Sequence, residues 1–181
     1  ALYIGIFTVL LVLTTCNYEL AILLPKKEDE ALDIVKLVFF LSLVISSIIG
    51  ILVWVFNKDI CEILENDDIG PWLYFLPFST FVSGVYKTLN YWFNRKRDFK
   101  RLAQNRVIQS SFTGGSQVLL SYLNSNGLNL LIGSLIGQLI TVFTLFIKFF
   151  KVEKSNILNV SYLKLKKIAF RYSDFPKYDL P

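Results

Sequence analysis

The apolar residues of this chain are concentrated in five long blocks, at residues 2–24, 37–56, 71–93, 107–123 and 128–147. A helix needs about 20 mostly apolar residues to cross the hydrocarbon of a bilayer. Strands of a membrane barrel would instead alternate apolar and polar residues, and the blocks lack that alternation. A chain that is 54% hydrophobic is also more apolar than an ordinary soluble domain. We therefore expect an all-α membrane protein, in which residues 1–150 form a bundle of five transmembrane helices.

Lys and Arg are concentrated in alternate connections between these blocks, and this bias predicts the orientation. Residues 94–106 hold six basic side chains, residues 25–36 hold three and residues 148–181 hold eight, whereas residues 57–70 hold only Lys58 among five acids. Basic connections stay in the cytoplasm. We expect a multi-pass protein of the cytoplasmic (inner) membrane, with its amino terminus outside and its carboxy terminus in the cytoplasm. Basic residues spaced by membrane thickness do not suit nucleic-acid binding, so the expected partner is membrane lipid and not nucleic acid.

The start of the chain does not resemble the start of a natural reading frame. The first residue is Ala1, Met is absent, and no charged segment precedes the first apolar block. The block is therefore not a signal peptide. A chain that begins outside without a start residue is predicted to be part of a longer protein.

Glu19 is the only acid within the five blocks. A carboxylate in hydrocarbon is costly unless it faces protein or water, so it is a functional candidate. On a helix, Thr8, Thr15 and Glu19 share one face. In one interpretation Glu19 lies at the cytoplasmic interface near Pro25 and pairs with a nearby lysine. In the other it lines a water-filled cavity, where it pairs with a cation or carries a proton.

The fourth block is too polar to contact lipid on all sides. Its polar residues gather on one helical face, which is formed by Gln109, Ser110, Thr113, Gly114, Gln117 and Ser121. We expect this face to line a cavity or to contact other helices. Small residues also recur at four-residue spacing in the second and fifth blocks, and they predict close approach of helices. They are Ser42, Ser46 and Gly50, and Gly133, Gly137 and Thr141.

Lys87 lies inside the third block, two turns before Arg95. One interpretation is that its side chain extends to the inner headgroups along its own apolar stem. The alternative is that Lys87 and Asn90 point, with basic neighbours, into a vestibule that attracts anions.

Residues 151–181 differ in character from the preceding blocks. Apolar residues keep helical spacing from Leu158 to Tyr172, and the basic residues lie mostly on the other side. This pattern predicts an amphipathic helix on the inner leaflet, which would act as a cytoplasmic linker.

The chain lacks the residues that most enzymes use. It has no histidine, no Cys/His cluster with metal-ligand spacing, no paired acids within the blocks and no phosphate-binding glycine loop. We therefore expect no metal site, and a binding and moving role rather than an enzymatic one.

Several strings in this order resemble the polysaccharide biosynthesis flippases, which export lipid-linked oligosaccharides and belong to the multidrug/oligosaccharidyl-lipid/polysaccharide superfamily. The strings are YELAILLPK at 18–26, EDEA at 28–31, PWLYFLP at 71–77, LNYW at 89–92 followed by Arg95, Phe99 and Lys100, Gly133 with Gly137 and Gln138, and RYSDFP at 171–176. The resemblance implies a fold of two helical lobes around a central cavity. On this basis the chain is similar to the second through sixth helices of the amino-terminal lobe, and the second lobe is missing.

The resemblance also implies a function in surface polysaccharide biosynthesis, such as that of O-antigen and lipopolysaccharide. Such proteins move a polyprenyl-pyrophosphate-linked glycan across the membrane by alternating access, which is driven by an H⁺ or Na⁺ gradient and needs no other cofactor. The substrate-binding candidates are Arg95, Arg97 and Lys100 for the headgroup, Lys87 and Asn90 further inward, and Gln109, Thr113 and Gln117 for sugar hydroxyls. Glu19 is the candidate for ion coupling or a gating salt bridge. For the Arg95 cluster, the alternative is orientation of the protein and binding to anionic lipid headgroups.

Two other classes of function stay open at this stage. A drug or cation exporter of the same superfamily would use the carboxylate in an acidic cavity, but the excess of inward basic residues argues against it. A membrane enzyme that polymerises glycans would normally carry large outer loops. The longest outer connection here is only residues 57–70.

Overall fold

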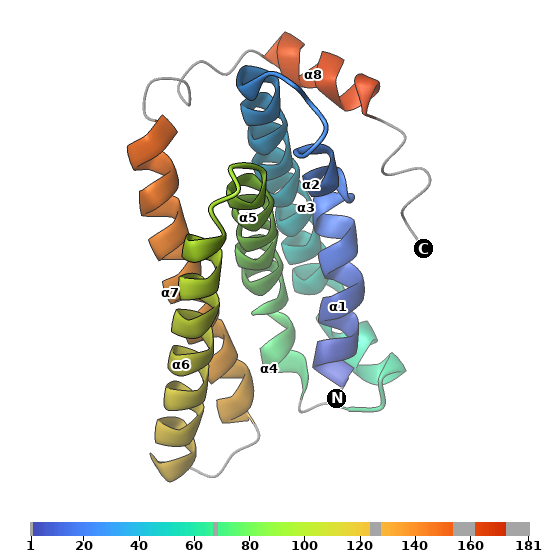
Figure 1. Cartoon of the computed structure of the whole chain (residues 1–181). Helices are drawn as coiled ribbons and strands as arrows, with labels where there is room; N and C mark the ends of the chain where they lie inside the picture. The colour runs from blue at the N-terminus through green and yellow to red at the C-terminus, as the bar shows by residue number, and fades with distance from the viewer. Residues whose placement is uncertain (1, 67–68, 124–127, 154–161, 173–181) are drawn as a thin grey trace.

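The computed structural model describes residues 2–66, 69–123, 128–153 and 162–172, and all regular elements within these ranges are helices. In chain order they are α1 (Leu2–Thr15), α2 (Tyr18–Ala21), α3 (Glu28–Ile63), α4 (Gly70–Leu73), α5 (Leu76–Arg95), α6 (Phe99–Leu123), α7 (Leu128–Glu153) and α8 (Tyr162–Arg171). The long helices run side by side, and α8 lies across the end where α3 begins (Figure 1). The all-helical fold class predicted from the sequence is thus confirmed for the described residues.

The first apolar block is not one continuous helix, which corrects the prediction for residues 2–24. Helix α1 ends at Thr15 and α2 begins at Tyr18. Between them, Cys16 and Asn17 have φ angles of 47° and 55°. Asn tolerates this left-handed region, but for Cys it costs roughly 1–2 kcal/mol. The chain therefore changes direction inside the block, one turn before Glu19.

Two further blocks also differ from their predicted bounds. The block at 71–93 is divided into α4 and α5, each of which has a proline in its first turn. The block at 37–56 lies within α3, a single helix of 36 residues that kinks at Phe56. Its first turn contains Glu28, Asp29 and Glu30, whose negative charges favour a helix amino terminus. The helix is therefore longer than its apolar block at both ends, where its residues include charged side chains.

Two helices in the described ranges are long and apolar enough to cross a membrane, namely α3 and the Asn129–Lys151 part of α7. Only 28% and 22% of their most apolar windows are buried inside the protein. The core helix of a soluble protein would be mostly buried, whereas here large apolar side chains are exposed, such as Trp54 on α3 at 75%. Apolar surface on this scale requires a lipid or protein neighbour. These two helices favour membrane association, and the crossings of the other three blocks stay a prediction.

The helices approach one another closely at small residues, as the sequence predicted. A Cβ atom added to Gly137 on α7 would lie 2.9 Å from the backbone nitrogen of Thr113 on α6. A Cβ atom added to Gly84 on α5 would lie 2.7 Å from Oγ of Ser42 on α3. Only a helix surface without side-chain atoms permits such contacts. The prediction of close packing is confirmed at these positions.

Helix α8 docks on protein rather than leaving its apolar face free for lipid. Leu165 and Ile168 are buried in the main apolar core. The Arg171 guanidinium donates to Glu30 on α3 at 2.7 Å, and the Tyr18 hydroxyl donates to the Ala169 carbonyl at 2.9 Å. A helix is present at Tyr162–Arg171, within the predicted amphipathic segment, whereas Leu158 lies outside the described residues. Contact of its exposed side with the inner leaflet stays a prediction.

Candidate functional site

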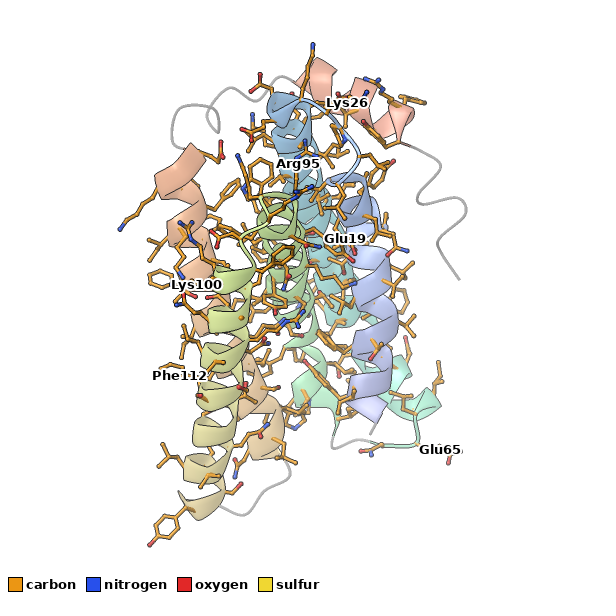
Figure 2. All side chains as sticks on the ribbon, viewed as in Figure 1. Glu19, Lys26, Glu65, Arg95, Lys100 and Phe112 are labelled. Atoms are coloured by element: carbon orange, nitrogen blue, oxygen red, sulfur yellow. The ribbon has the colours of Figure 1, made fainter. Side chains whose placement is uncertain are left out.

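The break between α1 and α2 places Glu19 against α5, where its carboxylate meets Lys87. The Lys87 Nζ atom lies 3.5 Å from Glu19 Oε1. The Glu19 side chain is only 4% exposed, whereas that of Lys87 is 30% exposed. Figure 2 shows Glu19 between the α1–α2 region and α5, on the interior side of Arg95. Glu19 is therefore paired with a lysine on a distant part of the chain rather than with Lys26 or Lys27.

This pair is incompletely satisfied. Glu19 Oε2 is buried and has no hydrogen-bond partner, and the same holds for the Thr15 hydroxyl at the end of α1. An unsatisfied buried polar group costs about 1–3 kcal/mol, and more when it is charged. Such groups are uncommon in folded proteins, and many have a functional explanation. Glu19 remains the leading candidate for a site that binds a proton or a cation.

Arg95 has a clear structural role. Its guanidinium donates to the Ile22 carbonyl at 3.0 Å and also to the Pro25 carbonyl. These carbonyls follow the last turn of α2, where helices leave acceptors unpaired. Arg95 therefore holds the α2–α3 connection onto the end of α5. Its role toward a headgroup stays a prediction.

Lys96 is the centre of an ion-pair network that the sequence did not reveal. Its Nζ atom lies 2.8 Å from Glu28 and 3.3 Å from Glu153, so it joins the ends of three helices. The hydrogen bond to Lys96 and its charge lower the pKa of Glu28. Burial acts to lower the pKa of Lys96, but the bonds and charges of the two glutamates outweigh it and raise that pKa. No sequence signal could show this pairing, because the three residues meet only after the helices pack.

An open groove of about 590 Å³ lies at this basic end of the protein. Its lining contains four cations and one acid. The lining residues are Leu23, Lys26, Glu28, Asn94, Arg95, Lys96, Arg97 and Phe99. Lys26 and Arg97 are both exposed, and Arg97 stands at the α5–α6 bend with a φ angle of 55°. Lys100 and Asn90 are not among the lining residues; Lys100 is exposed on the first turn of α6, and Asn90 is partly buried on α5.

The three residues predicted to contact sugar lie at the interface of α6 and α7. Thr113 and the Gln109 carbonyl lie against Gly137, and Gln117 lies against Gly133. The Gln117 amide also donates to the Leu130 carbonyl at 3.0 Å. This part of the polar face of α6 thus contacts another helix, which is one of the two outcomes expected from the sequence, whereas Ser110 and Ser121 of the same face are exposed. Contact with sugar stays a prediction for these residues.

Several features together define the class of the protein. Apolar helices are exposed along their length, basic side chains gather at one end, and a buried carboxylate–ammonium pair lies between two helices. The described residues contain no group of three or more potential metal ligands. The exposed apolar helices are typical of a helical protein that associates with a membrane.

Comparison with known families identifies the group to which the chain belongs. The family described as "Polysaccharide biosynthesis protein" matches residues 1–170. The chain is therefore a member of this family, and it has a role in polysaccharide biosynthesis. No curated protein and no solved structure matches it. The family match supports the polysaccharide biosynthesis part of the resemblance found in the sequence strings, whereas the flippase activity and the superfamily stay a prediction.

Proposed function

We propose that this chain is part of a flippase of the multidrug/oligosaccharidyl-lipid/polysaccharide superfamily. It moves a polyprenyl-pyrophosphate-linked oligosaccharide from the inner to the outer leaflet of the cytoplasmic membrane. All five apolar blocks cross the membrane, with the amino terminus outside and α8 in the cytoplasm. A second lobe completes the transport pathway, and an H⁺ or Na⁺ gradient drives alternating access. The family match and the gathering of basic residues at one end support this proposal.

The observation that carries the proposal is the basic groove. A pyrophosphate group cannot enter hydrocarbon without a large desolvation cost. Charge-assisted hydrogen bonds from Lys and Arg offset that cost. The groove offers two exposed side chains of this kind, Lys26 and Arg97. Its other two cations, Arg95 and Lys96, are held by backbone carbonyls and by glutamates. The polyprenyl tail stays in lipid beside the exposed apolar helices.

The buried pair of Glu19 and Lys87 forms the next step of the proposed substrate path, further inward than the groove. Lys87 lies two turns from Arg95 along α5, so a headgroup that leaves the groove meets a second cation. Glu19 then provides the ionisable group for coupling or gating. A drug or cation exporter is less well supported, because the carboxylate that would attract a cation already binds Lys87.

The headgroup role is tested by neutralising the two exposed cations of the groove. The double variant Lys26→Gln, Arg97→Gln should slow flipping about tenfold or more, because the loss of even about 1.4 kcal/mol of headgroup binding gives that factor. Flipping is measured with a fluorescent lipid-linked oligosaccharide in proteoliposomes that contain the two-lobed transporter. Arg95 is unsuitable as the test residue, because Arg95→Ala would also release the α2–α3 connection.

Lys58→Gln serves as the matched control. Lys58 is an exposed lysine near the far end of α3, so its removal changes the net charge without touching the groove. Its flipping rate should equal that of the native protein. Normal flipping by the double variant, with normal insertion, would eliminate the headgroup role and leave orientation and lipid-headgroup binding as the function of these cations.

A further inference from the structure

The two members of the buried ion pair differ in access to solvent. The Glu19 side chain is 4% exposed and is enclosed where the α1–α2 region packs on α5, whereas 30% of the Lys87 side chain remains exposed. Lys87 is therefore the more accessible member of the pair.

We propose that Lys87 exchanges partners between Glu19 and a diphosphate anion, and that Glu19 takes up one proton when Lys87 leaves it. This inference rests on the proposed function, because it assigns the diphosphate of the substrate to the same pair. In the empty protein the ammonium neutralises Glu19. In the loaded protein it neutralises the diphosphate, and a proton from solvent neutralises Glu19. Anion binding and proton binding are thereby linked. Because this proton leaves with the diphosphate, the ion gradient that drives transport acts at a different step of the cycle.

The need for a proton follows from the surroundings of Glu19. Its Oε2 atom already lacks a hydrogen-bond partner, so Oε1 makes the one contact with Lys87 that compensates the charge. Without that contact the carboxylate would be a buried, uncompensated charge, which is strongly unfavourable. A protonated carboxyl carries no charge and gains an O–H donor. The Thr15 hydroxyl, also buried and without a partner, belongs to the last residue of α1, on the other side of the break from Glu19.

The other ionisable side chains near Glu19 do not replace Lys87 as its counter-charge. Arg95 on α5 is held by the carbonyls of Ile22 and Pro25. On α3, Asp33 and Lys36 form an ion pair with each other at 3.2 Å. Cys16 and Tyr91 lie close enough to feel the charge of Glu19, but neither can carry a positive charge. The Tyr18 hydroxyl donates to Ala169 on α8.

The test measures proton uptake when a diphosphate diester binds. UDP-glucose is a suitable probe, because its phosphates do not titrate near neutral pH. Calorimetric titration of the detergent-solubilised chain is repeated at pH 7 in buffers with different ionisation enthalpies, which gives the number of protons bound. The native protein should take up about one proton per probe, and its affinity should fall as the pH is raised.

Three variants separate the parts of the linkage. Glu19→Gln should bind the probe without proton uptake, and its affinity should no longer depend on pH. Lys87→Gln should bind at least about tenfold more weakly. The double variant Glu19→Gln, Lys87→Gln replaces the ion pair by two neutral amides, so it should fold, bind weakly and take up no proton. Asp33→Asn is the matched control, because it removes the acid of another lysine–carboxylate pair, and it should retain the native uptake.

Two results would overturn the partner exchange: no probe binding to the native chain, or equal proton uptake by the native chain and Glu19→Gln. Failure of the proposed function is a separate outcome, because it is read from flipping by the Lys26→Gln, Arg97→Gln variant. If that variant flips normally and the native chain still takes up a proton on binding the probe, the groove is not part of the transport pathway. The exchange of partners at Lys87 then still stands.

Discussion

At the scale of single residues, Gly137 determines how closely α6 and α7 approach. A Cβ atom at this position would lie 2.9 Å from the Thr113 backbone nitrogen, so the obstacle is backbone that a side-chain rotation cannot move. Gly137→Ala should therefore force the helices apart and destabilise the protein by about 1–3 kcal/mol, the usual cost of overpacking. The free energy of unfolding in detergent, measured by chemical denaturation, tests this expectation.

Gly115→Ala is the control for the same pair of helices. Gly115 lies within α6, and no heavy atom lies within 4 Å of the position that its Cβ would occupy. The substitution should be neutral or stabilising by up to about 1 kcal/mol, because Ala favours a helix more than Gly does. Equal destabilisation by the two substitutions would contradict a specific contact at Gly137.

The residues of the candidate site could be predicted from the sequence more readily than their partners. Glu19 is conspicuous as the only acid in the apolar blocks, and the structure shows it buried. Its partner Lys87 is 68 positions away, so the pairing depends on the helix break and on the packing of α5. The ion pairs of Lys96 also could not be predicted, because Glu28 and Glu153 are far from it in the sequence. A sequence shows charge and spacing, but ion pairs between helices require the tertiary register.

At the scale of elements, the apolar blocks predict the existence of the helices better than their ends. The fifth block and α7 both begin at Leu128, but the helix continues to Glu153 because helical geometry does not require apolar residues. The break at Cys16 and Asn17 could not be predicted, because the chain there contains no proline or glycine.

Helix α8 allows a direct test of protein docking against lipid docking. Ile168 is 9% exposed within the core, whereas Phe170 on the same helix is 72% exposed. Ile168→Ala should release α8, because truncation of a core isoleucine costs about 2–5 kcal/mol. Hydrogen exchange of the backbone amides of α8 should then become faster, while that of α3 stays slow.

Phe170→Ala is the matched change on the exposed face of α8. It should leave the exchange of the helix unchanged if protein contacts hold α8 in place. The reverse order, with Phe170→Ala faster and Ile168→Ala unchanged, would show that α8 is held by the inner leaflet instead. The comparison is made in lipid nanodiscs, so that both surfaces are available to the helix.

At the scale of the whole molecule, the distribution of charge separates the two ends of the bundle. The basic groove with Lys26 and Arg95 lies at one end, and Glu65 lies near the other, as Figure 2 shows. The two ends differ in the sign of their exposed charge, so the rule that basic connections stay inside predicts one orientation. The short outer connection between α3 and α4 then faces away from the cytoplasm.

Cysteine labelling in intact cells tests this orientation. The native Cys16 and Cys61 are first replaced by Ala, and a single cysteine is introduced by Lys58→Cys or by Arg97→Cys, at two exposed positions. A maleimide that cannot cross membranes should label the first variant directly and the second only after the cells are permeabilised. Equal labelling of both from outside would contradict the five-crossing topology. It would also remove the groove from the cytoplasmic side, where a headgroup made in the cytoplasm must first bind.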